Sequence, residues 1–153
     1  MKHFIIITNR PKDPDLEITR RVQELLKLRQ ASCSVYADEI PKEEWKRILL
    51  REGDRTDAIL VLGGDGTMLR AARDTADSQI PMLGINLGTL GYLTEVEKNG
   101  MEDAIDRLVA GSYQVEDRMM LCAQIYRQGR MEEENSALND ITITRCGHLR
   151  MLS

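Results

Sequence analysis

The stretch that decides the fold runs from Ala58 to Thr67 and reads AILVLGGDGT. It opens with a continuous apolar run, which is typical of a strand buried on both faces of a parallel sheet. A glycine-rich turn follows, and a helix is expected to begin near Thr67. Glycine adopts backbone angles that are closed to other residues, and the first turn of a helix offers unpaired N–H groups to an anion. The sequence therefore predicts a strand, a phosphate-binding turn and a helix in direct succession.

Strand-like and helix-like segments alternate on both sides of this stretch. Strands are predicted at residues 4–8, 32–37, 58–62 and 82–85, and helices from Asp13 (the cap, with Pro14 at the first helical position), from Pro41, and at residues 67–76. This alternation indicates an α/β fold, a Rossmann-like parallel sheet with flanking helices. Ligands of such sheets bind at the carboxyl ends of the strands. The loops after Thr8, Leu62 and Ile85 are therefore expected at the functional edge.

The pattern changes after about residue 112. Residues 113–127 alternate loosely, Gln128-Gly129-Arg130 is a turn signal, and residues 136–145 are strand-like with β-branched side chains. These features indicate an antiparallel hairpin. We predict an α/β domain with the GGDGT motif at residues 1–112 and the start of an incomplete, β-rich domain at residues 113–153.

Composition excludes several functional classes. The chain has 153 residues and a net charge of -4, which argues against a protein that coats nucleic acid through many phosphate contacts. Its apolar runs are too short to cross a bilayer, so no membrane partner is expected. Cys33, Cys122 and Cys146 have no paired spacing, which favours free thiols in the cytoplasm. His3 and His148 match no metal pattern, so we predict no metal site built from protein side chains.

Asp65 is the informative residue of the turn, because a carboxylate in a phosphate cradle is repelled by phosphate. Its presence suggests a positive charge to hold or a proton to take, and both are needed when a hydroxyl attacks ATP. A base near that hydroxyl contributes about 10²–10⁴-fold to the rate. The alternative is that Asp65 only caps the helix and the glycines only turn the chain. The turn is neither a Walker A loop nor a Gly-x-Gly-x-x-Gly fingerprint.

The GGDGT motif resembles the motif shared by a kinase superfamily that includes NAD kinases, diacylglycerol and sphingosine kinases, and 6-phosphofructokinases. Met68 and Leu69, directly after the motif, resemble the residues at this point in NAD kinases, whereas the lipid kinases usually continue with Asn-Glu. Residues 81–93, PMLGINLGTLGYL, closely resemble the second NAD kinase motif. Residues 137–140, ALND, resemble the family's Asn-Glu motif with Asp in place of Glu. The resemblance to NAD kinases therefore extends over essentially the whole chain.

This resemblance implies a two-domain enzyme that phosphorylates the 2′-hydroxyl of the adenosine ribose of NAD with ATP to give NADP. It implies Mg²⁺ or another divalent cation with the ATP, and a homo-oligomer, a dimer or tetramer, in the complete protein. The family's NAD-binding segment, resembling Thr-Pro-Thr-Gly-Ser-Thr-Ala-Tyr, is missing from this sequence. We therefore expect the chain to be incomplete as a catalyst. The alternatives are another kinase of the superfamily, acting on a lipid or sugar, and a non-catalytic nucleotide-binding fragment.

The resemblance also assigns roles to the residues of the first motif. Asp65 matches the proton acceptor that faces the 2′-hydroxyl, and Gly66 matches its neighbour at the NAD site. The phosphate side of the site is matched by Gly63, Gly64 and Thr67. Arg70 matches a basic position of some members and is expected to meet phosphate, the alternative being a solvated helix face.

Four further residues are assigned to NAD binding. Asn139 and Asp140 match the pair that holds NAD, although Asp is one methylene shorter than the family's Glu. Arg150 lies where the family often has a basic substrate contact. Tyr92 is expected to stack near an adenine. The alternatives are an ordinary turn for the pair and a core position for the tyrosine.

Overall fold

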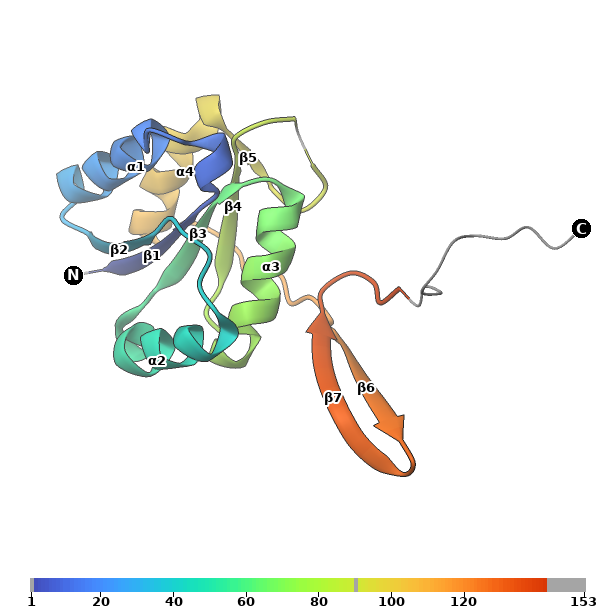
Figure 1. The fold of residues 1–153 in the computed structure, drawn as a ribbon. Helices are drawn as coiled ribbons and strands as arrows, with labels where there is room; N and C mark the ends of the chain where they lie inside the picture. Colours follow the sequence, from blue (N-terminus) through green and yellow to red (C-terminus); the bar gives the residue numbers. More distant parts are fainter. Residues whose placement is uncertain (1, 90, 143–153) are drawn as a thin grey trace, which may run out of the picture. The chain divides into compact units, whose positions relative to one another are not determined.

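The computed structural model describes residues 2–89 and 91–142 and contains two sheets (Figure 1). The chain divides into two compact units, Met1–Asp117 and Arg118–Ser153, each with one sheet. The first unit holds five parallel strands in the order β2-β1-β3-β4-β5. The strands are β1 (His3–Thr8), β2 (Ser32–Tyr36), β3 (Ala58–Gly63), β4 (Met82–Asn86) and β5 (Val96–Glu97). The predicted α/β fold is confirmed.

Strands β1 and β3, which are neighbours in the sheet, are buried along their whole length, as their continuous apolar sequences predict. Their parallel register pairs Phe4 with Ala58 and Thr8 with Leu62, so both strands end at the same edge of the sheet. β1 lies between β2 and β3, which means that the chain changes direction across the sheet at β1. In open α/β sheets the crevice beside such a switch point is where ligands bind. A ligand site is therefore expected between the loops after β1 and β3.

Helices cover both faces of this sheet (Figure 1). α1 (Glu17–Leu28) and α4 (Met101–Ala110) lie on one face, and α2 (Lys42–Glu52) and α3 (Asp65–Thr75) lie on the other. Because neighbouring side chains of a strand point to opposite faces, each strand feeds two cores. The first core includes Phe4, Ile6, Val22, Leu25, Leu60, Leu62 and Ile105, and the second includes Ile5, Ile7, Trp45, Ile48, Ile59, Val61 and Ala71.

The start of α1 differs from the prediction. The helix begins at Glu17 instead of directly after Asp13, and Leu16 occupies the capping position with a φ of 55°. Asp13 nevertheless performs the capping chemistry from further upstream. Its buried carboxylate accepts the N–H of Ile18 at 3.2 Å, the N–H of Thr19 at 2.9 Å and the hydroxyl of Thr19 at 2.7 Å. The loop after β1 is thus fastened to the first turn of α1.

This arrangement predicts a pH-dependent contribution of Asp13 to stability. Burial raises the pKa of Asp13, but the hydrogen bonds from Thr19 and Ile18 outweigh it and hold the pKa below its usual value. The stabilisation is therefore present at neutral pH and is lost as the pH falls through the lowered pKa. We expect Asp13→Ala to lower the free energy of unfolding by about 0.5–2 kcal/mol at neutral pH, measured by urea unfolding.

The difference between Asp13→Ala and the unchanged chain should shrink below about pH 4, where the carboxylate of the unfolded chain is also protonated. Asp15→Ala is the matched control, because Asp15 is exposed and lies two positions away. A surface change of this kind alters stability by less than about 0.5 kcal/mol. An Asp13→Ala deficit of the same size in acid as at neutral pH would show that the charge of Asp13 is not what stabilises the loop.

The second unit contains the predicted antiparallel hairpin, formed by β6 (Leu121–Arg127) and β7 (Arg130–Ala137). The turn lies at Gln128 and Gly129, whose φ values of 50° and 77° are those of a two-residue hairpin turn. The strand predicted at residues 136–145 is wrong in its bounds as far as residue 142, because the ladder ends at Ala137, and residues 143–145 lie outside the described residues. A tight turn directly after β6 sets the register, so the partner strand begins at Arg130. No helix among the described residues is long and apolar enough to span a membrane.

Candidate functional site

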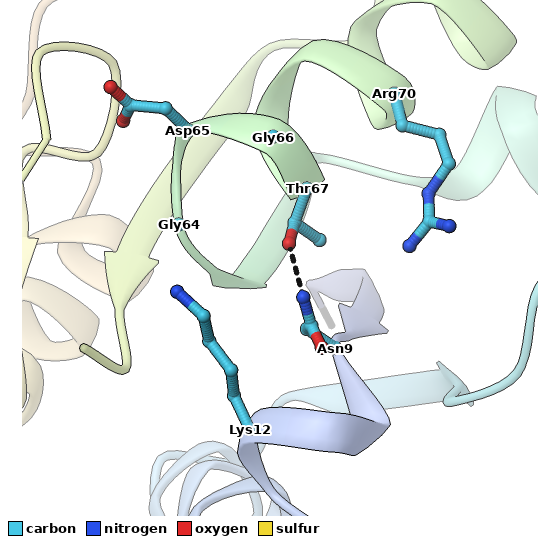
Figure 2. Close-up of a pocket in the computed structure, with 7 residues that line it drawn as sticks. All are labelled: Asn9, Lys12, Gly64, Asp65, Gly66, Thr67 and Arg70. Atoms are coloured by element: carbon cyan, nitrogen blue, oxygen red, sulfur yellow. Dashed lines mark hydrogen bonds between the residues drawn. The ribbon is translucent and has the colours of Figure 1, made fainter. Parts of the chain in front are cut away.

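A pocket of about 340 Å³ opens in the first unit where the loops after β1 and β3 meet (Figure 2). It lies at the switch point between the two strands, where the topology predicts a ligand site. Its lining residues are Asn9, Lys12, Gly64, Asp65, Gly66, Thr67 and Arg70. Five of them belong to the GGDGT stretch and the helix after it, where the sequence predicts a phosphate-binding turn. Asn9 and Lys12 come from the loop after β1 and were not among the candidates.

The glycine-rich turn forms the first turn of α3, and the helix begins at Asp65, two residues before the predicted start. Gly64 has extended backbone angles, and its carbonyl accepts the N–H groups of Thr67 at 2.9 Å and Met68 at 3.0 Å. No side chain caps this helix. The alternative that Asp65 only caps α3 is therefore wrong, because its carboxylate bonds elsewhere.

The carboxylate of Asp65 is turned away from Lys12 and Arg70, toward the loop that follows β4 (Figure 2). It accepts the main-chain N–H of Tyr92 at 2.8 Å and of Leu93 at 3.1 Å, and the hydroxyl of Thr94 lies 3.4 Å away. The hydrogen bond from Tyr92, followed by that from Leu93, lowers the pKa of Asp65 despite some desolvation. The group is thus a carboxylate at neutral pH. The main-chain N–H of Thr94 also hydrogen-bonds to this carboxylate, so residues 92–94 together fix its orientation.

A buried asparagine shapes this same loop. Asn86, at the end of β4, donates its amide to the carbonyl of Thr89 at 2.7 Å and to the hydroxyl of Thr94 at 3.0 Å, and its Oδ1 accepts the N–H of Gly88 at 2.7 Å. Gly91 lies directly against the carboxylate of Asp65, where any Cβ would collide with it. The loop within the second stretch of the resemblance, residues 81–93, therefore forms the surroundings of Asp65.

Tyr92 contacts Asp65 through its main chain only. Its side chain is 97% exposed, so the alternative that Tyr92 is a core residue is wrong. An exposed aromatic ring next to the site is free to stack on a base.

The pocket wall carries two cationic side chains and one amide. Arg70 forms an ion pair with Glu39, whereas Arg73 on the same helix pairs with Asp74 at 2.8 Å. Arg70 thus lines the pocket while its charge is paired with an exposed carboxylate. Asn9 donates its amide to the Thr67 hydroxyl at 2.9 Å, which ties the loop after β1 to α3 (Figure 2).

The remaining predicted residues lie outside this pocket wall. Gly63 is buried beneath Thr67 and takes part through packing. Asn139 and Asp140 follow β7 in the second unit, where both are exposed and the Asn139 amide lies 3.2 Å from the Asp140 carboxylate. The same carboxylate accepts the Thr142 hydroxyl at 3.3 Å. Arg150 lies outside the described residues.

Metal ligands do not gather in the described part of the chain. Within residues 2–89 and 91–142 there is no group of three His, Cys, Asp or Glu side chains that could hold a metal ion. A divalent cation at this pocket would therefore depend mainly on ligands brought by a nucleotide.

Comparison with known proteins gives relatives over the whole chain. The chain is 41% identical over 154 residues to the NAD kinase of Agathobacter rectalis, covering 100% of this chain and 53% of that protein. It is 36% identical over 161 residues to the NAD kinase of Lachnospira eligens, covering 99% of this chain and 53% of that protein. The chain thus spans about half the length of the curated relatives it matches.

The fold and the family agree with these relatives. The structure resembles yeast NADH kinase, solved in complex with NADH, with a TM-score of 0.65 and 18% identity over 90% of this chain and 47% of that one. Residues 4–113 match the family described as ATP-NAD kinase N-terminal domain. This match covers most of the sequence, and the chain belongs to the NAD kinase family.

Proposed function

We propose that the protein transfers a phosphoryl group from ATP to the 2′-hydroxyl of the adenosine ribose of NAD, giving NADP. The observation that carries this proposal is that neighbouring residues of one short turn face two different sides. Gly64, Gly66 and Arg70 face a pocket of phosphate-binding character, while the Asp65 carboxylate faces the loop of residues 91–94. A phosphate site and a hydroxyl acceptor are thus one residue apart. The relatives named NAD kinase support NAD as the acceptor.

In this mechanism the triphosphate of ATP lies in the pocket and the ribose hydroxyl approaches the carboxylate of Asp65. The hydroxyl oxygen attacks the γ-phosphorus, the bond to the β-phosphate oxygen breaks, and ADP leaves. The hydroxyl proton passes to Asp65 and then to solvent. The lowered pKa makes Asp65 a weak base. This is sufficient because the transition state of phosphoryl transfer is loose in most analyses, and positioning and charge stabilisation do most of the work.

A divalent cation fits this site as part of the nucleotide. Mg²⁺ usually keeps several waters and binds through substrate phosphates with one or two protein ligands. That preference suits a pocket whose described residues include no carboxylate cluster. When bound, Mg²⁺ would neutralise charge on the phosphates that Gly64, Thr67 and Arg70 are proposed to surround, with Gly63 packed beneath Thr67.

The resemblance to NAD kinases gives the proposed contacts to NAD. They are Asp65, Gly66, Tyr92, Asn139, Asp140 and Arg150. Asn139 can donate and accept at once, which suits a ribose or an adenine edge. We expect the complete protein to be a cytoplasmic homo-oligomer, a dimer or tetramer.

An assay of NADP formation tests the proposal on two proteins. One is this chain, and the other is a chimera that continues after Ser153 with the C-terminal half of the Agathobacter rectalis relative. We expect the chimera to form NADP from NAD and ATP with Mg²⁺, detected with an NADP-specific dehydrogenase. We expect this chain alone to form none that is detectable, because it spans about half of its relatives.

A panel of acceptors separates the alternatives. Faster phosphorylation of diacylglycerol or fructose 6-phosphate than of NAD by the chimera would contradict the proposed acceptor. If the chimera binds ATP by calorimetry but phosphorylates no member of the panel, the chain is a nucleotide-binding fragment without catalysis.

A further inference from the structure

Lys12 lies on a loop that is fixed to the strand ends on both sides. It is the last residue of a 3₁₀ turn, Arg10–Lys12. The main-chain N–H of Lys12 donates to the carbonyl of Asn9 at 2.9 Å. The N–H of Asn9 in turn donates to the carbonyl of Leu62 at 2.8 Å, at the end of β3. The next residue, Asp13, is buried and bonded to α1. The backbone that carries Lys12 is therefore held in place on both sides.

The ammonium of Lys12 reaches over the glycine-rich turn (Figure 2). A Cβ atom at Gly64 would lie 2.7 Å from Nζ, and one at Gly88 would lie 3.2 Å from it. The side chain thus occupies space that the two glycines leave open. Its charge lies where the loops after β1, β3 and β4 come together, directly beside the first turn of α3.

This charge differs from the other cations near the pocket in having no counter-ion. Arg70 is paired with Glu39, and Arg10 lies 3.7 Å from Asp38. Among residues 2–89 and 91–142 the structure shows no hydrogen bond or ion pair for the Lys12 ammonium. The Asp65 carboxylate points to the opposite side of the turn, toward residue 92. Among the described residues that line the pocket, the Lys12 ammonium is therefore the positive charge without a counter-ion.

We infer that Lys12 binds the terminal phosphate of the phosphoryl donor and is the main cationic contact of the pocket. This inference rests on the proposed function for the identity of the donor. Phosphoryl transfer develops charge on the oxygens of the transferred group, and a lysine beside them stabilises it. The GGDGT turn contains no lysine of its own, unlike a Walker A loop. Lys12 provides this charge from the loop after β1, and Arg70 is secondary because a phosphate must compete with Glu39 for it.

Calorimetric titration of this chain with tripolyphosphate tests the inference without requiring catalysis. We expect Lys12→Met to weaken binding by about 10- to 100-fold, the size of a lost charge-assisted hydrogen bond. Arg70→Met should weaken it by less than about fivefold, because its charge is already paired at the surface. Lys27→Met is the matched control and should leave binding unchanged. Lys27 is exposed in the last turn of α1, which ends at the opposite edge of the sheet.

The chimera supplies a second readout. Lys12→Met is expected to raise the KM for ATP and lower kcat for NADP formation with the KM for NAD unchanged, and Lys12→Arg should restore part of the loss. Equal tripolyphosphate affinities of Lys12→Met and the unchanged chain would overturn the inference, as would a larger loss in Arg70→Met. A chimera that forms no NADP while its tripolyphosphate binding depends on Lys12 would refute the proposed function and leave the phosphate site standing.

Discussion

Asp65→Asn is expected to lower kcat for NADP formation by the chimera by about 10²–10⁴-fold. The substitution removes the negative charge that accepts the hydroxyl proton and keeps the shape of the side chain. An amide can still accept one of the N–H groups of Tyr92 and Leu93, but its own NH₂ faces the other. The KM for NAD should therefore rise by less than the fall in kcat. Steady-state kinetics of the unchanged chimera and of its Asp65→Asn variant measures kcat and the KM for NAD separately.

The matched control is Asp77→Asn, which removes an exposed carboxylate beyond the other end of α3. It should leave both kinetic constants unchanged. Near-normal kcat in Asp65→Asn would remove Asp65 from the role of proton acceptor. A large rise in the KM for NAD without a fall in kcat would make Asp65 a positioning residue of the loop instead. Because its pKa is lowered, Asp65 should cause no loss of activity until the pH falls below about 4.

Gly63→Ala is expected to be among the most destabilising single changes in the glycine-rich turn. A Cβ at Gly63 would lie 2.6 Å from the Cβ of Thr67 and 2.9 Å from its Cγ2. The Thr67 Cβ is attached directly to the main chain of α3, so no rotation of the side chain relieves the contact. Overpacking of a buried site costs about 1–3 kcal/mol or more. Urea unfolding of this chain measures the loss.

Gly66→Ala is the matched variant on the same turn. A Cβ at Gly66 meets no atom within 4 Å, and Gly66 lies inside the first turn of α3. Alanine in place of glycine in a helix is favourable by up to about 1 kcal/mol. The two variants should therefore move the free energy of unfolding in opposite directions. Equal effects would mean that the turn does not need the close approach of Gly63 and Thr67.

Sequence patterns predicted the four long parallel strands, most directly β1 and β3, which are buried along their whole length and continuously apolar. The same reasoning did not reach β5, since two residues are too few to show a period. It also did not reach α4, although Met101, Ile105 and Leu108 form its buried face at helical spacing. The second hairpin strand was placed too late in the sequence. β-branched residues at 141–144 suggested it, whereas a glutamate-rich segment beginning at Arg130 pairs because the turn sets the register.

The candidate site was predictable where one short segment builds it and not where distant segments meet. The strand, turn and helix around Asp65 follow from local chemistry. Topology indicated the loop after Thr8 as part of the functional edge, but not which side chains of that loop turn inward. Asn9 and Lys12 reach the pocket because the main-chain N–H of Asn9 bonds to Leu62 and its side-chain amide bonds to Thr67. Contacts between residues some fifty positions apart leave no periodic trace in a sequence.

Because residue 91 is glycine, the Asp65 carboxylate lies in direct contact with the main chain of the loop after β4. Rotamer freedom of this aspartate is consequently removed when the protein folds and not when nucleotides arrive. In the proposed reaction a substrate hydroxyl would meet a preorganised acceptor that needs no rearrangement. The carboxylate that is proposed to take the proton would thus keep the same orientation through every catalytic cycle.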